Sequence, residues 1–365
     1  MKITNIETIV LNLPMIIEAN AVPHPGGRPR TSVDMLFVRI DTDEGVSGWG
    51  EASANRLLTA TKAFIDTVAV EVCVGRDPTA ITDIASLLDR GLGAAGRSSL
   101  VRYASSAIDI ALWDIAGKLA GLPLYRLLGG STRKDLPAYA SLLRYTDPAT
   151  VARYTERALQ RGFRHVKLHE ITLPAIEAGR MAAGPDIPVM VDCNCAWSAD
   201  EAIDMAHRLE PLKLKWLEEP VWPPTDFAGI ARVRREGRIA TAAGENALFA
   251  DFFRMFEAGS LSYAQPSVAR VGGVTEFRKV LTLAEAFNVE VVPHAAYFGP
   301  GLIATLHCNA AMSKETLVER YEIDFSENPM HDAIKPDRNG RFTVPQRPGL
   351  GVEPDSRIIE KFRVR

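Results

Sequence analysis

Three short apolar runs, IPVMVD (187–192), LKLKWLE (212–218) and RIATAAGE (238–245), each end in an acid. Glu218 follows Asp192 by 26 residues and Glu245 follows Glu218 by 27. One strand and one helix with their loops take about that many residues, so the spacing predicts neighbouring parallel strands whose carboxyl ends meet at one face. Three adjacent carboxylates repel one another strongly unless a cation lies between them. The stretch therefore predicts a divalent metal site, whose oxygen ligands suit Mg²⁺ and leave Mn²⁺ as a substitute.

The same pattern of apolar runs extends on both sides of this stretch, from Asp135 to about Asp332. Apolar runs alternate there with helical patterns about every 20 to 30 residues, which is the period of strand–helix units in a parallel barrel. The eight runs end near Tyr145, His169, Asp192, Glu218, Glu245, Pro266, His294 and Glu319. They predict an α/β fold, a modified (β/α)8 TIM barrel, with the polar residue after each run on the catalytic face.

The chain before the barrel has a different pattern: runs in which apolar and polar residues alternate are followed by one long helical pattern. Residues 2–13 alternate as a strand does, and residues 35–52 form two strand-like runs around a turn. Residues 98–120 carry apolar side chains at helical spacing. We therefore predict an α+β domain over residues 1–125, a barrel over residues 126–332, and a C-terminal segment over residues 333–365 that returns to the first domain.

Composition excludes several classes of function. The 365 residues are 47% hydrophobic and 24% charged with a formal net charge of −3, so no basic surface for nucleic acid is expected. No apolar run approaches the length of a membrane span and the N-terminus lacks a secretion signal, which predicts a cytoplasmic protein without membrane contact. The four cysteines form no C-x-x-C pair and are expected to be reduced. The partner that remains is a small molecule.

Two basic residues, Lys167 and His169, share one strand in the stretch H-V-K-L-H-E (165–170). Residues two apart on a strand point to the same side, so both side chains would enter the mouth of the barrel. Two cations in one site do not easily stay protonated together, and imidazole titrates near neutrality. We expect His169 to be a general base with Lys167 beside it. The alternative is a surface lysine and a structural histidine.

Several further motifs occur in a fixed order along the whole chain. They are G-W-G-E (48–51), A-I-D-I-A-L-W-D-I-A-G-K (107–118), the three acids, V-G-G-V-T (271–275), P-H (293–294) and P-G-L-G-V-E (348–353). With these motifs the chain resembles the enolase superfamily, and most closely its mandelate racemase subgroup. The resemblance implies an α+β capping domain over a modified TIM barrel, one Mg²⁺ per subunit and a homo-oligomer. It also implies removal of the proton α to a substrate carboxylate.

The family's pattern assigns roles to individual positions near the metal. The implied metal ligands are Asp192, Glu218 and Glu245. Glu219 should point away from Glu218, because successive strand residues face opposite sides, and would support the ligands from behind. The subgroup has lysine at both base positions, so His169 is a departure. Lys167 would then bind the substrate carboxylate or depress the pKa of His169.

The opposite side of the site departs from the pattern more strongly. His294 takes the place of a histidine acid/base, but the aspartate that usually partners it, five residues before the Gly-Gly pair, is Ser267 here. Without a carboxylate partner, His294 should be a weaker base and, once protonated, a stronger acid. Arg270 matches a basic residue near the Gly-Gly pair, with a structural ion pair as the alternative. Glu319 matches an acid that hydrogen-bonds the substrate carboxylate, and Glu322 competes for that place.

Substrate contacts are expected from the Pro- and Gly-rich loop at residues 18–31 and from the loops that follow the first and third barrel runs. The candidates are His24, Arg28, Arg144, Tyr145 and Asn194. We expect dehydration of a sugar acid to a 2-keto-3-deoxy acid, because a His294 shifted toward an acid role can protonate a leaving hydroxyl. The alternatives are a racemase or epimerase of a 2-hydroxy acid and a cycloisomerase of a sugar-acid lactone. A catalytically silent homologue that binds a carboxylate, favoured only by Ser267, is a further alternative.

Overall fold

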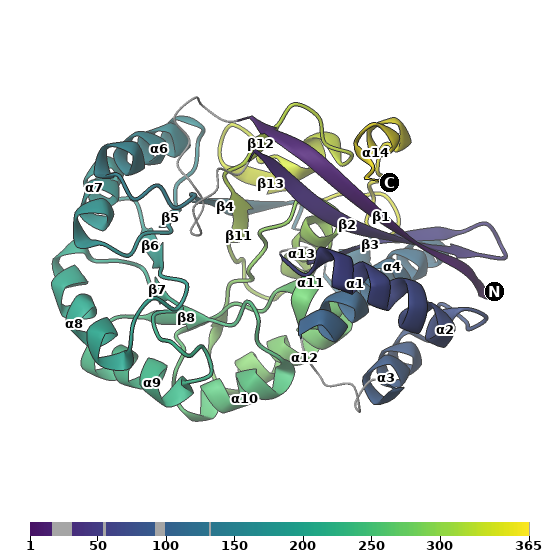
Figure 1. Ribbon diagram of the computed structural model, residues 1–365, viewed down its shortest axis with the longest axis horizontal. Helices are drawn as coiled ribbons and strands as arrows, with labels where there is room; N and C mark the ends of the chain where they lie inside the picture. The colour runs from purple at the N-terminus through teal and green to yellow at the C-terminus, as the bar shows by residue number, and fades with distance from the viewer. Residues whose placement is uncertain (17–30, 54–55, 92–98, 131–132, 365) are drawn as a thin grey trace.

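The computed structural model places an antiparallel sheet beside a curled parallel sheet (Figure 1). It describes residues 1–16, 31–53, 56–91, 99–130 and 133–364. Within these residues, no helix is both long enough and apolar enough to span a membrane. The candidate contacts His24 and Arg28 lie outside the described residues.

The antiparallel sheet is built mostly from the N-terminal part of the chain. Its strands, in spatial order, are β12 (Asp324–Phe325), β1 (Ile3–Ile16), β2 (Ser32–Thr42) and β3 (Ser47–Ala52). The helices beside it are α1 (Leu58–Phe64), α2 (Val70–Cys73), α3 (Ile81–Gly91), α4 (Ser99–Ala120) and α5 (Leu124–Leu127), with a π-helical stretch at Ile65–Ala69. The predicted hairpin and long helix are therefore confirmed.

The G-W-G-E motif fixes β3 against α4. A Cβ at Gly48 or Gly50 would overlap the main-chain carbonyl of Ala111 or Ala107 on the helix, so only glycine lets the strand lie this close. The main-chain N–H of Trp49 donates to Asp114 Oδ2 over 3.0 Å. This packing directs Glu51, the last residue of the motif, from the antiparallel sheet toward the barrel.

The parallel sheet has the strand order of a curled barrel. In chain order its strands are β4 (Asp135–Ser141), β5 (Val166–Leu168), β6 (Val189–Asp192), β7 (Leu217–Glu218), β8 (Thr241–Ala243), β9 (Tyr263–Ala264), β10 (Glu290–Val291) and β11 (Val318–Tyr321). Each strand from β4 to β9 pairs in parallel with the next, and β11 pairs in parallel with β4. The described strands β10 and β11 share no ladder, and the Thr316 hydroxyl donates to Val291 O across that gap over 2.8 Å. The predicted fold class is confirmed, with this one open seam.

Helices cover the outside of the parallel sheet (Figure 1). They are α6 (Pro148–Gln160), α7 (Leu173–Ala183), α8 (Ala199–Leu209), α9 (Phe227–Glu236), α10 (Phe249–Glu257), α11 (Val268–Val271), α12 (Gly273–Ala286) and α13 (Pro300–Ala311). Local sequence starts several of them. Asp147 caps α6 and accepts from Thr150 N, with Pro148 in the first turn. Ser198 and Glu201 form a reciprocal capping box at α8.

The C-terminal segment contacts both sheets. Strand β13 (Arg341–Thr343) pairs antiparallel with β4, and after α14 (Ser356–Phe362) the N–H of Val364 donates to Val10 O of β1 over 2.9 Å. The exact division of the chain at residues 125 and 332 stays a prediction. All four cysteines are free, as expected from the sequence.

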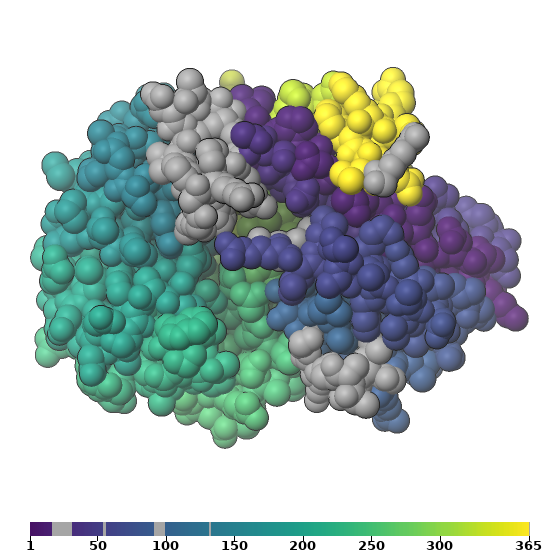
Figure 2. Space-filling view, viewed as in Figure 1, coloured from purple at the N-terminus to yellow at the C-terminus, as the bar shows by residue number. Residues whose placement is uncertain are grey.

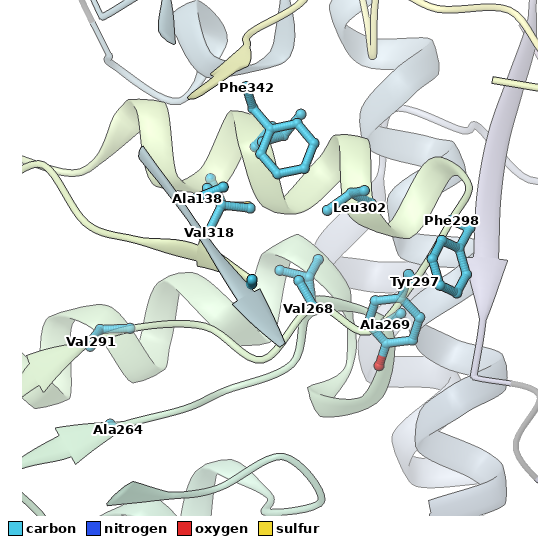
Figure 3. Close-up of a cluster of buried hydrophobic side chains, with 14 of the residues drawn as sticks. Ala138, Ala264, Val268, Ala269, Val291, Tyr297, Phe298, Leu302, Val318 and Phe342 are labelled. Atoms are coloured by element: carbon cyan, nitrogen blue, oxygen red, sulfur yellow. The ribbon is translucent and has the colours of Figure 1, made fainter. Parts of the chain in front are cut away.

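Two apolar clusters hold the barrel together. A small one fills its interior with Tyr139, Met190, Trp216, Ala242, Val292 and Leu317. A larger one packs the helices and loops around the sheet; Figure 3 shows part of it, including Leu302 of α13 and Val318 of β11. Tyr297 and Phe298 belong to this cluster and extend in different directions from the loop after β10 (Figure 3). That loop also carries His294.

Candidate active site

A cavity of about 510 Å³ lies between the antiparallel sheet and the carboxyl ends of the barrel strands. Figure 2 shows the two halves of the molecule in contact, the N-terminal part in purple and blue and the barrel in teal and green. The lining includes Met35 and Glu51 from the antiparallel sheet and His169, Glu245 and His294 from the barrel. Both halves therefore contribute to the wall, as the predicted capping arrangement requires.

Strand register brings the predicted acids to one level of the barrel. Asp192 and Glu218 are directly paired at the ends of β6 and β7, and Glu245 comes two residues after β8 ends. Glu319 lies inside β11, opposite Tyr139 of β4. Asp192 and Glu319 push the pKa of Glu218 upward, and Asp192 acts on Glu245 in the same direction, as expected for acids that lie close together.

Lys167 lies beneath these acids and is fully buried. Its Nζ is 2.7 Å from Glu218 Oε1, 2.9 Å from Glu319 Oε1 and 3.5 Å from Asp192 Oδ2. Burial alone would lower the pKa of the lysine, but Glu218 and Glu319 raise it well above its usual value. Lys167 is therefore a permanent cation here. Lys167 is not among the residues that line the cavity.

The charges of the site are unbalanced. Five carboxylates, Asp192, Glu218, Glu219, Glu245 and Glu319, surround two permanent cations, Lys167 and Arg270. Burial together with Asp192 and Glu319 raises the pKa of Glu218 to about 8, and burial together with Glu245 and Asp192 raises that of Glu219. Oxygen donors that repel one another in this way fit a hard divalent cation.

The acids are nevertheless not arranged as a ready metal cage. Among the described residues, no three His, Cys, Asp or Glu side chains converge in a way that could hold a metal ion. Glu218 is bonded to Lys167, while Glu245 accepts from Arg270 over 2.9 Å. The assignment of Asp192, Glu218 and Glu245 as metal ligands therefore stays a prediction.

The neighbours Glu218 and Glu219 differ from the expected alternation. Glu218 points into the barrel, where its Oε2 accepts from Trp216 Nε1 over 2.9 Å and from Gln265 Nε2 over 2.7 Å. Glu219 lines the cavity, because strand β7 ends at Glu218 and Glu219 has a φ of +43°. The strict two-residue alternation ends with the strand, so the expectation that Glu219 faces away from the site is wrong.

His169 is held by the main chain and by one acid. Its Nδ1 is 2.5 Å from Leu142 O, and its Nε2 is 3.1 Å from Asp192 Oδ2. A carbonyl oxygen only accepts, so Nδ1 must carry a proton, which leaves Nε2, beside the Asp192 carboxylate, as the ring atom that can exchange a proton at the cavity. The ring packs edge-on against Tyr321 at 5.8 Å between centroids. The base predicted at this position is thus held with Nε2 as its reactive atom.

His294 has the opposite arrangement. Its Nε2 lies 3.1 Å from Glu245 Oε2, and its Nδ1 lies 3.2 Å from Ser267 Oγ. Burial and Arg270 lower the pKa of His294 to about 4, so the ring is neutral near pH 7. Because a carboxylate only accepts, the single proton of the ring is on Nε2 and Nδ1 accepts from Ser267.

The predicted substrate contacts that the structure describes lie around the cavity. Arg144 donates from Nε to His169 O over 2.6 Å and from Nη2 to Asn194 Oδ1 over 3.0 Å. Asn194 in turn donates from Nδ2 to Asp192 Oδ1 over 2.8 Å. Tyr145 stacks on Tyr154 at 4.3 Å between ring centroids. Arg144, Tyr145 and Asn194 all line the cavity, and their contact with substrate stays a prediction.

Glu319 and Glu322, the two candidates for the acid that binds the substrate carboxylate, have different partners. Glu319 bonds Lys167, and its Oε2 accepts from Ala295 N over 2.7 Å, next to His294. Glu322 pairs with Arg161 over 2.9 Å, and both line the cavity. Glu319 therefore lies among the candidate catalytic residues, whereas Glu322 lies near the entry of β12.

Three residues of the site were missed by reading the sequence. Gln265 anchors Glu218, and Tyr297 contacts Ser267 with 2.5 Å between the two hydroxyl oxygens. Glu51 accepts from Gly301 N over 2.9 Å at the start of α13. Glu51 ends a quoted motif and could have been singled out, but Tyr297 lies in an irregular loop where no periodicity gives a signal.

Comparison with known proteins places the chain in a family. Residues 18–129 match the mandelate racemase/muconate lactonizing enzyme N-terminal domain, and residues 150–358 match the enolase C-terminal domain-like family. The chain belongs to the mandelate racemase/muconate lactonizing enzyme family of the enolase superfamily. The family membership predicted from the sequence is thereby confirmed.

Relatives within this family carry out more than one reaction. The chain is 33% identical to the 3,6-anhydro-alpha-L-galactonate cycloisomerase of Streptomyces coelicolor, over 91% of this chain and 92% of that protein. It is 32% identical to the D-galactonate dehydratase of Ralstonia nicotianae, over 90% and 91%. The crystal structure of a racemase from Streptomyces coelicolor A3(2) with bound magnesium matches with a TM-score of 0.88 at 30% identity, covering 99% of this chain and all of that one.

Proposed function

We propose that this family member dehydrates a sugar acid to a 2-keto-3-deoxy acid. The observation that carries the proposal is the difference between the Nδ1 partners of the two histidines at the cavity: Nδ1 of His169 donates to Leu142 O, so only Nε2 can take up a proton, whereas Nδ1 of His294 accepts from Ser267, so the ring proton is on Nε2. An elimination needs one group that takes a proton and another that gives one. A two-base racemisation would instead need a base on each side.

His169 would take the proton from the carbon next to the substrate carboxylate. As that C–H bond breaks, the bond to the β-hydroxyl breaks as well, and His294 delivers its Nε2 proton so that the hydroxyl leaves as water. The ring is left as an imidazolate, which the Ser267 hydroxyl stabilises by donating to Nδ1. The resulting enol then becomes the 2-keto acid. Arg144 orients His169 through its main-chain oxygen and contacts Asn194, so the loops after β4, β5 and β6 are held together around the base.

A divalent cation is part of the proposal because the donor set fits one. We propose that Asp192, Glu218 and Glu245 hold Mg²⁺, with Glu219 as the alternative to Glu218 because Glu219 lines the cavity. The ion supplies positive charge where the substrate carboxylate gains electron density. The relative with bound magnesium supports this assignment. Thermal shifts on adding Mg²⁺ to Glu218→Gln and Glu219→Gln would separate the two: the true ligand loses the shift, and equal shifts in both variants contradict the choice of either.

The reaction is tested by offering aldonic and aldaric acids with Mg²⁺ and measuring formation of a 2-keto acid. We expect at least one to be turned over. If none is, while deuterium from the solvent enters the α-carbon of a recovered substrate, dehydration is wrong and racemisation takes its place.

Cycloisomerisation of a sugar-acid lactone is the second candidate, favoured by the similarity to a cycloisomerase. It uses the same first step, but no water leaves. A lactone or anhydro acid would then be consumed with no change in elemental composition, and mass spectrometry distinguishes this product from the dehydrated one, which is lighter by one water.

A further inference from the structure

The partner of His294 is a chain of two hydroxyl groups instead of a carboxylate. Ser267 Oγ lies 3.2 Å from His294 Nδ1 and 2.5 Å from the hydroxyl oxygen of Tyr297. The three side chains are almost completely buried, with exposed fractions of 4% for His294, 0% for Ser267 and 6% for Tyr297. The described contacts of Ser267 Oγ are these two, so its hydrogen-bond directions can be worked out.

Glu245 sets the direction of the chain. Its carboxylate lies 3.1 Å from His294 Nε2 and only accepts, so Nε2 carries a proton. The described hydrogen-bond acceptor of the Tyr297 hydroxyl is Ser267 Oγ, so Tyr297 donates there and Ser267 gives its own proton to Nδ1. The oxygen of Ser267 remains free to accept, and Tyr297 is the donor within reach. The order is therefore Tyr297 to Ser267 to His294, ending with the Nε2 proton at the cavity.

Tyr297 is itself held in place from two sides. The Arg270 guanidinium lies 5.9 Å from the centre of its ring, and the ring of His294 packs edge-on to it at 5.8 Å. Burial raises the pKa of Tyr297 above its usual value, so its hydroxyl keeps its proton and remains a donor. The side chain also lines the cavity, whereas Ser267 does not.

We infer that Tyr297 is a positioning residue for His294 that acts through Ser267. By donating to Ser267, it directs the Ser267 proton to Nδ1 and so keeps the Nε2 proton of His294 facing the cavity. This inference rests on the proposed function in one respect, namely that His294 gives its proton to the leaving hydroxyl. The tautomer itself does not depend on any reaction.

The first test measures the hydrogen bond directly, in the metal-free protein labelled with ¹⁵N-histidine. The signals of His294 are identified by their loss in His294→Asn. In the wild type we expect a protonated Nε2 and a hydrogen-bonded Nδ1 lone pair. In Tyr297→Phe and in Ser267→Ala, the Nδ1 signal should move toward that of an unbonded imine nitrogen. A protonated Nδ1 in the wild type, or an unmoved signal in both variants, overturns the inference.

The matched control is Tyr321→Phe. Tyr321 packs edge-on to His169 at the same 5.8 Å, but the tautomer of His169 is set by the main-chain oxygen of Leu142. Removing this hydroxyl should leave the protonation pattern of both histidines as it was. A change at His294 in this variant as large as that in Tyr297→Phe would mean that the signal reports loosened packing, which also overturns the inference.

The second test uses turnover and distinguishes positioning from direct contact with the substrate. One hydrogen bond between neutral groups is worth about 0.5–1.5 kcal/mol, so Tyr297→Phe should lower the ratio of dehydration to α-deuterium exchange by up to about tenfold. In a Ser267→Ala background, Tyr297→Phe should lower it no further, because the chain is already broken. An additional drop there means that Tyr297 contacts the substrate instead. Absence of dehydration with the expected ¹⁵N signals would refute the proposed function and leave the inference intact.

Discussion

The two histidines face the same cavity and are anchored in opposite ways. Each packs edge-on to a tyrosine at 5.8 Å, yet His169 donates from Nδ1 to a main-chain carbonyl while His294 accepts at Nδ1 from a side-chain hydroxyl. A carbonyl can only accept, so the tautomer of His169 is fixed by the fold. A hydroxyl both donates and accepts, so the tautomer of His294 depends on what lies behind Ser267. In the proposed reaction, the same residue type serves as base on one side and acid on the other.

The charged and polar groups around the two histidine rings also differ. On the His169 side, Asp192 contacts both His169 and Lys167 and accepts from Asn194. On the His294 side, Arg270 pairs with Glu245, which contacts His294, and Glu51 of the antiparallel sheet accepts from Gly301 N at the start of α13. Removing a group from one side should therefore affect one half of the reaction more than the other.

The largest effect is expected for His169→Asn, which removes the base. General base catalysis contributes about 10²–10⁴-fold, so both dehydration and α-deuterium exchange should fall by about 10³-fold or more. The measurement is the rate of 2-keto acid formation beside deuterium uptake by mass spectrometry. Exchange that persists at the wild-type rate would show that another group takes the α-proton.

His294→Asn should separate the two halves of the reaction. Dehydration is expected to fall by about 10²–10³-fold because the leaving hydroxyl loses its proton donor, whereas exchange at the α-carbon falls much less. Ligand binding, measured by calorimetry, should survive. If exchange and dehydration fall together in this variant, the assignment of different roles to the two histidines is wrong.

Glu51 gives the His294 side a pH-dependent stability. Burial raises its folded-state pKa from 4.5 to about 7. A carboxyl whose pKa is raised by folding favours the folded state below its unfolded pKa, and this stability is lost as pH rises from about 4.5 through 7. Between pH 5 and 8, the wild type should lose up to about 3 kcal/mol more unfolding free energy than Glu51→Gln, which keeps an acceptor for Gly301 N. The measurement is urea denaturation of both proteins at several pH values. Unfolding free energies that change with pH by the same amount in the two proteins would contradict the prediction.

The smallest effects compare two asparagines, one on each side. Asn194 donates from Nδ2 to Asp192 and also meets Arg144, while Asn246 donates from Nδ2 to Glu245 over 2.7 Å. Supporting bonds to metal ligands are worth about 10–100-fold in metal affinity, so Asn194→Ala should weaken Mg²⁺ binding by about that factor. Asn246→Ala should weaken it less, because Arg270 also donates to the Glu245 oxygen that Asn246 holds. Calorimetric titration decides, and the reverse order would contradict the comparison.

What the sequence could predict depends on periodicity. The acids at the strand ends, the Lys167–His169 pair and the barrel itself follow from regular spacing, and each appears where the spacing puts it. The roles of Glu218 and Glu219 could not be told apart, because the main chain leaves the strand conformation between them. Tyr297 was invisible because it lies in a loop after β10, where its contact with Ser267 depends on how two separate loops pack.

The seam between the seventh and eighth strands has a consequence for how the barrel can change over evolution. Where other strands are joined by a ladder, here the loop after β10 is tied to β11 through the carboxylate of Glu319, which accepts from Ala295 N while its other oxygen contacts Lys167. With the Thr316 bond to Val291 O, this side chain closes the wall, and it also completes the charge pattern. A library that varies this position for new substrates would therefore also select for closure of the barrel, so variants recovered there report folding and chemistry together. Redesign of specificity is better begun at the rim, where neighbouring strands close the wall by themselves.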